Sequence, residues 1–294
     1  MADTKVRVGA DFLPRNKEPF GHMFATKIIP RFILALMCLV YLAPFYWMVT
    51  TSFKSSAELS AFPPTLFPHS FIWKNYLDAL NYIPFLRFFL NSLILTAGST
   101  IGAVISNSFI AYGFARIDWK GRDVLFYVAI ATVFIPFPVT LVALFDIFAK
   151  LHWINTYLPL IVPTFFGQAF YLFLIRQFLM GIPNELSDAA RIDGANEFTT
   201  FTRIILPLMK PAMAVVAIFA AVNAWNDFLT PLIYLQTQAL YPLSIGLQFF
   251  RAEHTIAFSL LMAASTMVVI PVIILFLVFQ RFFVEGVTVG AIKG

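Results

Sequence analysis

The amino-acid sequence predicts an all-α membrane protein, and two features of its composition carry that prediction. Of its 294 residues, 60% are hydrophobic and only 12% are charged, which is too little charge to cover the surface of a soluble domain. The hydrophobic residues stand in long runs with weak alternation, which favours helices over a transmembrane barrel. Disordered chains, secreted scaffolds and cytosolic enzymes are therefore excluded. The single cysteine, Cys38, also excludes an internal disulfide framework and a cysteine-built zinc site.

Six uncharged tracts are long enough to be transmembrane helices, because a hydrocarbon core about 30 Å thick is crossed by roughly 20 helical residues. They cover 32–53, 88–115, 124–145, 151–175, 211–226 with a continuation beyond Asp227, and 255–280. The first tract follows a cationic leader, as in a signal peptide. It is too long for a signal peptide and lacks a small-residue cleavage sequence, so we expect it to stay in the protein as an uncleaved first helix. The expected organisation is an N-terminal segment 1–30, a six-helix domain 31–282 and a C-terminal tail 283–294.

The distribution of Lys and Arg predicts the orientation of these helices. With the N-terminus inside, fifteen of the 20 cationic residues fall on the cytoplasmic side, and the external ones are Lys54, Lys74, Arg87, Lys150 and Arg251. Because loops rich in positive charge stay in the cytoplasm, both termini are expected there. The net charge of +5 then marks a membrane face and does not indicate a nucleic-acid partner.

Three of the expected helices carry residues that pack closely or weaken the backbone. In the second span, Gly98 and Gly102 lie four positions apart among hydroxyl side chains, a pattern typical of close helix packing that would also suit a polar cavity. In the third span, Pro136 and Pro138 mark a place where a helix can bend, and in the fourth Gly167 does the same.

The largest cytoplasmic loop, about 177–208, has the strongest helix pattern of the polar stretches. Pro183 and Asn184 are residues that begin helices. Glu185 and Asp188 follow in the first turns, where the helix dipole favours negative charge. A short helix is therefore expected here.

One face of this short helix is predicted to be apolar, with mostly small side chains, so that another protein can approach closely. The residues that share it are Leu186, Ala189, Ala190 and Asp193. Ser187 is expected on the opposite face, and Arg191 is spaced to pair with Asp188.

A glycine turn and a second helix are expected to follow. Gly194 is a residue that ends helices in the left-handed conformation. Asn196 can cap a second helix over Glu197–Leu206, which Pro207 would stop. From spacing alone two interpretations stay open: a solvated loop, or a knob that fits a groove in another protein.

The loop resembles the EAA motif of binding-protein-dependent ABC importer permeases. The residues that carry the resemblance match the motif in order and in spacing. Asp188-Ala189-Ala190 is followed after three residues by Gly194, after nine more by Ile204, and after one more by Leu206-Pro207. Asp188 stands where the family usually has Glu, which keeps the charge on a shorter side chain. The resemblance to MalG-type carbohydrate permeases covers roughly 30–294, and the further segments that carry it are Asn91-Ser92-Leu93, Ala111 to Arg116, Trp225 to Phe228 and Gln280 to Gly294.

This resemblance implies the type I permease fold of ABC importers, in a multi-pass protein of the bacterial inner membrane. It implies three protein partners: a second homologous permease, a dimeric cytoplasmic ABC ATPase and an extracytoplasmic solute-binding protein. The tail from Arg281 is expected to reach between the ATPase subunits. The residues expected to couple the chain to the ATPase are Glu185, Leu186, Asp188, Ala189, Ala190, Arg191, Gly194, Ile204, Leu206 and Pro207.

The sequence offers no catalytic chemistry of its own. The glycine-rich ending over 286–294 is only superficially similar to a phosphate-binding loop, because its lysine is misplaced and no helix follows it. The four histidines are scattered without the spacing of metal ligands. We therefore expect no ATPase site, no metal and no cofactor.

Polar residues inside the fifth span need an explanation, because a charge in the bilayer is costly unless it faces protein or water. Asn223, Trp225, Asn226 and Asp227 are expected at the translocation pathway. The alternative is that they tie helices together by hydrogen bonds. A rival function, an ion-coupled secondary carrier or channel, would use Asp227 as its charge.

Overall fold

The computed structural model describes residues 24–251 and 257–291, and within those ranges the regular secondary structure is helical. The expected segment 1–30 therefore lies outside the described residues up to position 23, and the expected tail does so from position 292. The chain divides into two compact units, Met1–Val49 and Thr50–Gly294.

The first unit consists, in its described part, of one helical stretch. A π-helical turn, η1 (Phe24–Ile28), leads into α2 (Ile29–Ser52), whose last three residues belong to the second unit. From Ile29 to Val49 its side chains are largely exposed and, apart from Arg31 in the first turn, mostly apolar, as a helix in lipid requires. The expected first span is confirmed.

Helix α5 (Phe85–Arg116) is the helix around which the second unit is built. It packs against α9 (Ala169–Met180), α13 (Lys210–Asn226) and the short segments α8 (Leu158–Ile161) and η3 (Val162–Phe166). Because glycine, alanine and serine line its buried face, these neighbours approach its backbone closely.

The third and fourth expected spans are each interrupted at one point, and the third is sharply bent there. Helix α6 (Arg122–Ala131), with the 3-10 turn η2 (Thr132–Phe134), meets α7 (Phe137–Lys150) at 101°. The bend falls at Ile135-Pro136 and confirms the expected weak point of the third span. In the fourth span, the break between η3 and α9 falls at Gly167, whose φ is +86°, as expected.

The polar loop leads directly into the fifth span. It contains α10 (Glu185–Ile192), α11 (Glu197–Thr200), the π-helical turn η4 (Phe201–Ile205) and α12 (Leu206–Leu208), which meets α13 at 75°. The second helix does not stop at Pro207 but runs through Leu208. Pro207 directly follows the π-helical turn η4, where the regular helical hydrogen-bond pattern is already displaced.

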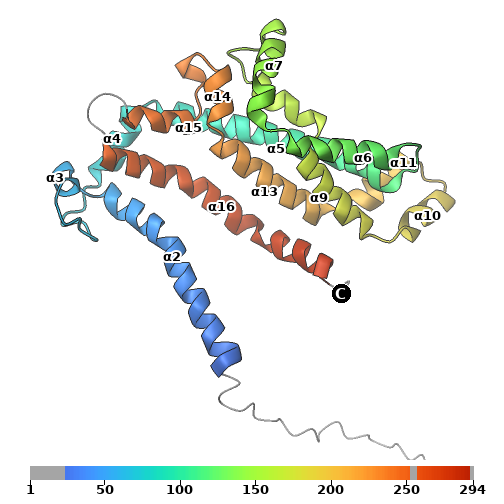
Figure 1. Ribbon diagram of the computed structural model, residues 1–294, viewed down its shortest axis with the longest axis horizontal. Helices are drawn as coiled ribbons and strands as arrows, with labels where there is room; N and C mark the ends of the chain where they lie inside the picture. The colour runs from blue at the N-terminus through green and yellow to red at the C-terminus, as the bar shows by residue number, and fades with distance from the viewer. Residues whose placement is uncertain (1–23, 252–256, 292–294) are drawn as a thin grey trace, which may run out of the picture. The chain divides into compact units, whose positions relative to one another are not determined.

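The remaining helices are short, apart from the last. They are α3 (Ser56–Leu59), α4 (Lys74–Tyr82), α14 (Leu229–Tyr234), η5 (Gln238–Leu240), α15 (Leu243–Gly246) and η6 (Leu247–Arg251). The last helix, α16 (Phe258–Ala291), is continuous across the expected boundary at 282–283. Within the second unit, α10 and α11 lie at one end, and α3 and α4 lie at the opposite end (Figure 1).

Each end of the second unit has its own hydrophobic core. The core nearer α10 contains the fully buried side chains of Ile175, Leu179, Ile205, Met209 and Val216. The other core contains Phe88, Phe250, Ala263 and Ala264. Among the described residues, four helices are long and apolar enough to cross a membrane, and the two bent pairs add two more if each is one span. This agrees with the six spans that the sequence predicts.

Candidate functional site

Helix α10 begins and ends where the sequence predicts. It starts after Pro183-Asn184, carries Glu185 and Asp188 in its first turn, and ends at Ile192. Gly194 follows with a φ of +81°, a left-handed conformation that costs a side-chain-bearing residue about 1–2 kcal/mol. The glycine turn is therefore confirmed, and it reverses the chain between α10 and α11.

Arg191 connects the two short helices through its guanidinium. Its Nη1 lies 3.0 Å from Asp188 Oδ1, which confirms the expected pair, and its Nε lies 2.9 Å from Glu197 Oε1. The hydrogen bond to Glu197 is the main reason that the pKa of Arg191 is raised. Asn196 caps α11 as expected, because its Oδ1 accepts from the backbone N–H of Thr199 at 2.8 Å. The loop is thus a defined structure and not a solvated coil.

The expected apolar face of α10 is divided by the fold. Leu186 and Ala189 are exposed, but Ala190 is only 5% exposed and turns toward the body of the unit, as does Ser187. These two lie three positions apart and therefore share one face of the helix. In the single chain, Ala190 therefore packs against the body of the unit, and its role in coupling stays a prediction. Periodicity defined a face, but it could not show which neighbouring helix covers part of it.

The other expected coupling residues divide in the same way. Glu185 and Pro207 are exposed. Ile204 and Leu206 are partly buried and pack against the core nearer α10, so they hold the second helix in place.

Two exposed apolar residues of this loop were missed by the sequence reasoning. Ile192 is 86% exposed and Phe198 is 67% exposed, one on each side of the glycine turn. Exposed apolar side chains that gather within a polar segment mark interaction sites, whereas single scattered ones do not. The available signal was their isolation in the most polar stretch of the chain. With Leu186 and Ala189 they give α10 and α11 an exposed apolar surface.

Two polar residues of the fifth span donate hydrogen bonds to neighbouring helices. Asn223 Nδ2 donates to the hydroxyl of Tyr171 on α9 at 2.9 Å, and Trp225 Nε1 donates to the carbonyl of Val268 on α16 at 3.2 Å. These bonds join helices, but Asn223 is also exposed, so both interpretations of this span stay open.

Asp227 and Asn226 lie at the point where α13 ends. The Oδ1 of Asp227 accepts from the backbone N–H of Thr230 at 3.1 Å, and its carbonyl accepts from the Ser244 hydroxyl at 2.7 Å. Asp227 therefore caps α14, a role that the sequence reasoning did not consider. Asn226 bonds within its own helix to Val222 and is exposed.

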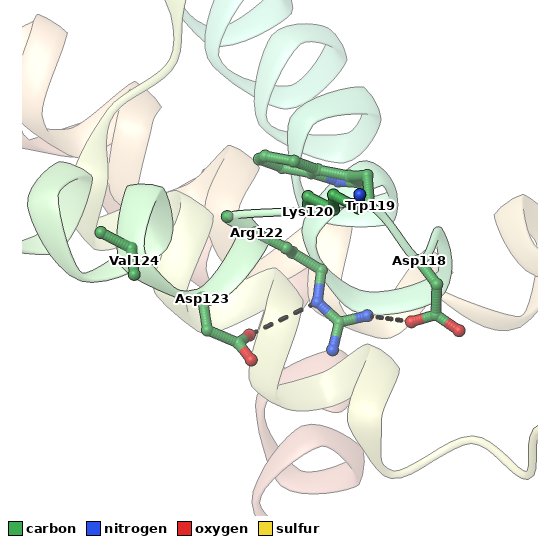
Figure 2. A pocket seen from close by; sticks show the side chains of 7 residues that line it. Asp118, Trp119, Lys120, Arg122, Asp123 and Val124 are labelled. Atoms are coloured by element: carbon green, nitrogen blue, oxygen red, sulfur yellow. Dashed lines mark hydrogen bonds and ion pairs between the residues drawn. The ribbon is translucent and has the colours of Figure 1, made fainter.

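Other candidate sites carry little chemistry. Among the described residues, no group of three His, Cys, Asp or Glu side chains could hold a metal ion. The glycine-rich stretch from 286 is helical through Ala291 and so does not form a phosphate-binding loop. A hollow of about 540 Å³ lined by residues 118–124 is occupied at its edge by Arg122, which pairs with Asp118 and Asp123 (Figure 2).

Comparison with protein families gives a match over most of the second unit. Residues 98–289 match the family described as binding-protein-dependent transport system inner membrane component.

Individual relatives match along nearly the whole chain. The arabinooligosaccharides transport system permease protein AraQ of Bacillus subtilis (strain 168) is 36% identical over 262 residues, which cover 88% of this chain and 93% of the relative. The sulfoquinovosyl glycerol transport system permease protein SmoH of Agrobacterium fabrum is 34% identical over 266 residues, covering 90% and 93% of the two chains.

A solved structure has the same fold. A chain of a bacterial ABC transporter involved in the import of the acidic polysaccharide alginate superposes with a TM-score of 0.76 at 22% identity. The match covers 92% of this chain and 99% of that one.

Proposed function

We propose that this chain, which belongs to the family of binding-protein-dependent transport system inner membrane components, imports a carbohydrate or related polyol by alternating access. It is a multi-pass protein of the inner membrane. In the proposed assembly it pairs with a second, homologous permease and receives the solute from an extracytoplasmic binding protein. A dimeric cytoplasmic ATPase supplies the energy, and α10 is the helix that the ATPase holds.

The observation that carries this proposal is the exposed apolar surface on α10 and α11. Ile192 and Phe198 stand on either side of Gly194, on a short element that is ordered by the Arg191 ion pairs. A rigid, exposed element of this kind suits insertion into a groove, because little conformational entropy is lost on binding. Motion of the ATPase would then be passed to α10 as a displacement of a packed body.

Several relatives support the solute class. The name of AraQ refers to arabinooligosaccharides and that of SmoH to sulfoquinovosyl glycerol, and the structural neighbour belongs to a transporter involved in the import of alginate. The chemistry that these solutes share is a hydroxyl-rich sugar ring. We therefore infer a saccharide or polyol as the solute of this chain.

For the translocation path, we infer that Asn223 and Asn226 contact the solute. They lie three positions apart on α13, so both amides project from the same face, and both are exposed in the single chain. Amide groups can donate to and accept from sugar hydroxyls. Trp225, which is buried, and Asp227, which caps α14, would hold this face in position. Since the carboxylate of Asp227 already has a structural role, ion coupling gains no support.

The proposal is tested by uptake in proteoliposomes that contain the chain, its partner permease, the ATPase and the binding protein. We expect uptake of a labelled oligosaccharide that stops when ATP is withdrawn and continues when ionophores collapse the ion gradients. Uptake that survives without ATP and stops with ionophores would instead establish the secondary carrier.

A further inference from the structure

The last turn of α5 contacts the non-helical turn that precedes α10. Arg116 is only 7% exposed, and its Nη2 donates to the carbonyls of Leu179 and Ile182, each at 2.6 Å. The Leu179 carbonyl lies in the last turn of α9 and also accepts from the backbone N–H of Ile182, and the Ile182 carbonyl lies in the turn that follows. A guanidinium at this place satisfies them and complements the negative end of the helix dipole.

The same guanidinium also reaches the start of α10. Its Nη1 donates to the side-chain Oδ1 of Asn184 at 2.5 Å and lies 3.4 Å from the carbonyl of Pro183. Asn184 stands at the N-terminus of α10, and its side chain is directed to Arg116 in place of capping the helix. The turn from Gly181 to Asn184 is therefore attached to α5 along its length.

Helix α10 is attached to α5 at its other end as well. Arg191 Nη2 donates to the carbonyl of Arg116 at 3.5 Å, and the Tyr112 hydroxyl donates to Glu197 Oε2 at 2.8 Å. Since Glu197 also pairs with Arg191, the final turn of α5 holds α10 from both sides of its short length.

Helix α9 is likewise held at both ends by α5. At its start, Asn107 Oδ1 accepts from the backbone N–H of Gln168 at 2.9 Å, and at its end Arg116 binds the carbonyls named above. Asn107 is fully buried. Asn107 and Arg116 lie nine positions apart, which spans about 13.5 Å of helix, comparable with the length of α9. The two helices are thus joined by polar bonds at two separate points.

We propose that Arg116 is a positioning residue for transport, which makes α5, α9 and α10 move as one rigid body. The inference deepens the proposed function and rests on it. Without Arg116, a displacement of α10 would be absorbed by bending at the Gly181–Asn184 turn, because the backbone bonds from Gly181 N and Ile182 N reach only to the end of α9. Arginine suits this place because its planar fork satisfies several acceptors at once, whereas lysine offers a single charged nitrogen.

The first test compares transport with ATP hydrolysis in the reconstituted complex. Arg116→Lys keeps the charge and removes the fork, and Asn184→Ala removes one acceptor. We expect both variants to retain bound ATPase, with solute imported per ATP hydrolysed falling about tenfold for Arg116→Lys and less for Asn184→Ala. The matched control, Arg122→Lys, alters a guanidinium in the exposed ion pairs of the neighbouring loop and should leave the ratio unchanged.

The second test measures rigidity directly and needs no solute. Spin labels are placed on Ile105→Cys in α5 and Asp193→Cys at the end of α10, in a Cys38→Ser background. We expect one narrow distance distribution with and without nucleotide in the assembled complex, and a broad one after Arg116→Lys. If that variant fails to assemble, Asn184→Ala decides by the same measurement.

The outcomes separate the two proposals. Absence of ATP-dependent saccharide uptake by the unsubstituted complex would contradict the proposed function. A distance that changes with nucleotide in the unsubstituted complex, or an unchanged transport ratio in Arg116→Lys, would overturn the role of Arg116.

Discussion

The interruptions of the third and fourth expected spans are held in different ways. At Gly167, between η3 and α9, side chains of α5 satisfy the irregular backbone: Ser99 donates to Leu160 O at 3.1 Å and Ser106 to Thr164 O at 2.9 Å. At Pro136, between α6 and α7, the hydrogen bonds join residues only three positions apart, such as Ile135 N to Thr132 O. Phe134 beside it is 84% exposed.

This difference indicates which of the two interruptions, at Gly167 or at Pro136, can transmit a displacement. A break that a neighbouring helix satisfies is fixed in its angle, because changing the angle exposes buried polar groups. The backbone around Pro136 is bonded only locally, so its angle can change without breaking hydrogen bonds to another helix. The α5–α9 pair is therefore the rigid part of the unit, and it leads directly into α10.

The largest expected effect on this comparison comes from Gly102→Ala in α5. An added Cβ would lie 2.7 Å from two ring carbons of Phe165 and closer still to Thr164, so η3 must move. We expect a loss of about 1–3 kcal/mol in the free energy of unfolding, measured by thermal unfolding in detergent. Gly113→Ala is the matched control on the same helix, because nothing lies within 4 Å of its Cβ position. Equal stabilities of the two variants would show that η3 does not pack on α5 as described.

Asn107→Ala should have the next largest effect. The substitution removes a fully buried amide together with its bonds to Gln168 N and Ala103 O, at a cost of about 1–3 kcal/mol. Thr140→Val on α7 is the control, since this exposed hydroxyl bonds only locally, to Phe137 O at 2.9 Å. Unfolding midpoints in detergent give both values. A cost for Thr140→Val as large as that for Asn107→Ala would abolish the distinction between the two bends.

Ser106→Ala tests, with a smaller change, the same set of hydrogen bonds from α5 to the backbone near Gly167. Its hydroxyl satisfies Thr164 O, and we expect a loss of about 0.5–1.5 kcal/mol in the free energy of unfolding. The loss should add little to that of Asn107→Ala, because neighbouring residues in one network are coupled. A double-mutant cycle measures this coupling, and strict additivity would argue against a shared network.

Pro136→Ala should change stability least and geometry most. It restores a backbone donor at the bend, so we expect the angle between α6 and α7 to move from 101° toward a straighter arrangement, with stability altered by less than about 0.5 kcal/mol. Distances between spin labels at Leu125→Cys and Val142→Cys report the angle. An unchanged distance would mean that the bend is held by tertiary contacts after all.

Features that depend on neighbouring residues in the chain were predictable from the sequence. The left-handed Gly194, the Asp188–Arg191 pair and the Asn196 cap are each defined within one or two helical turns, and the structure confirms all three. The weak points at Pro136 and Gly167 were also predictable, because proline and glycine act on the local backbone.

Features that depend on another helix were not predictable in this way. Helical periodicity placed Ala190 and Leu186 on one face, but only the packing against the body shows that Ala190 is buried. Arg116 is the last residue of the segment from Ala111 that carries the family resemblance, but nothing in the sequence indicated its acceptors. These lie at Leu179, Ile182 and Asn184, more than 60 positions away in sequence.

The proposed role of α10 is tested most directly by cross-linking it to the ATPase. With Ile192→Cys in a Cys38→Ser background and the full complex held in its nucleotide-bound state, a short bifunctional thiol reagent should join α10 to an ATPase subunit. The cross-link should be absent when the ATPase is removed. If Ile192→Cys instead reacts freely with a bulky water-soluble reagent in that complex, or can be reached only from the external side, α10 is not the docked helix.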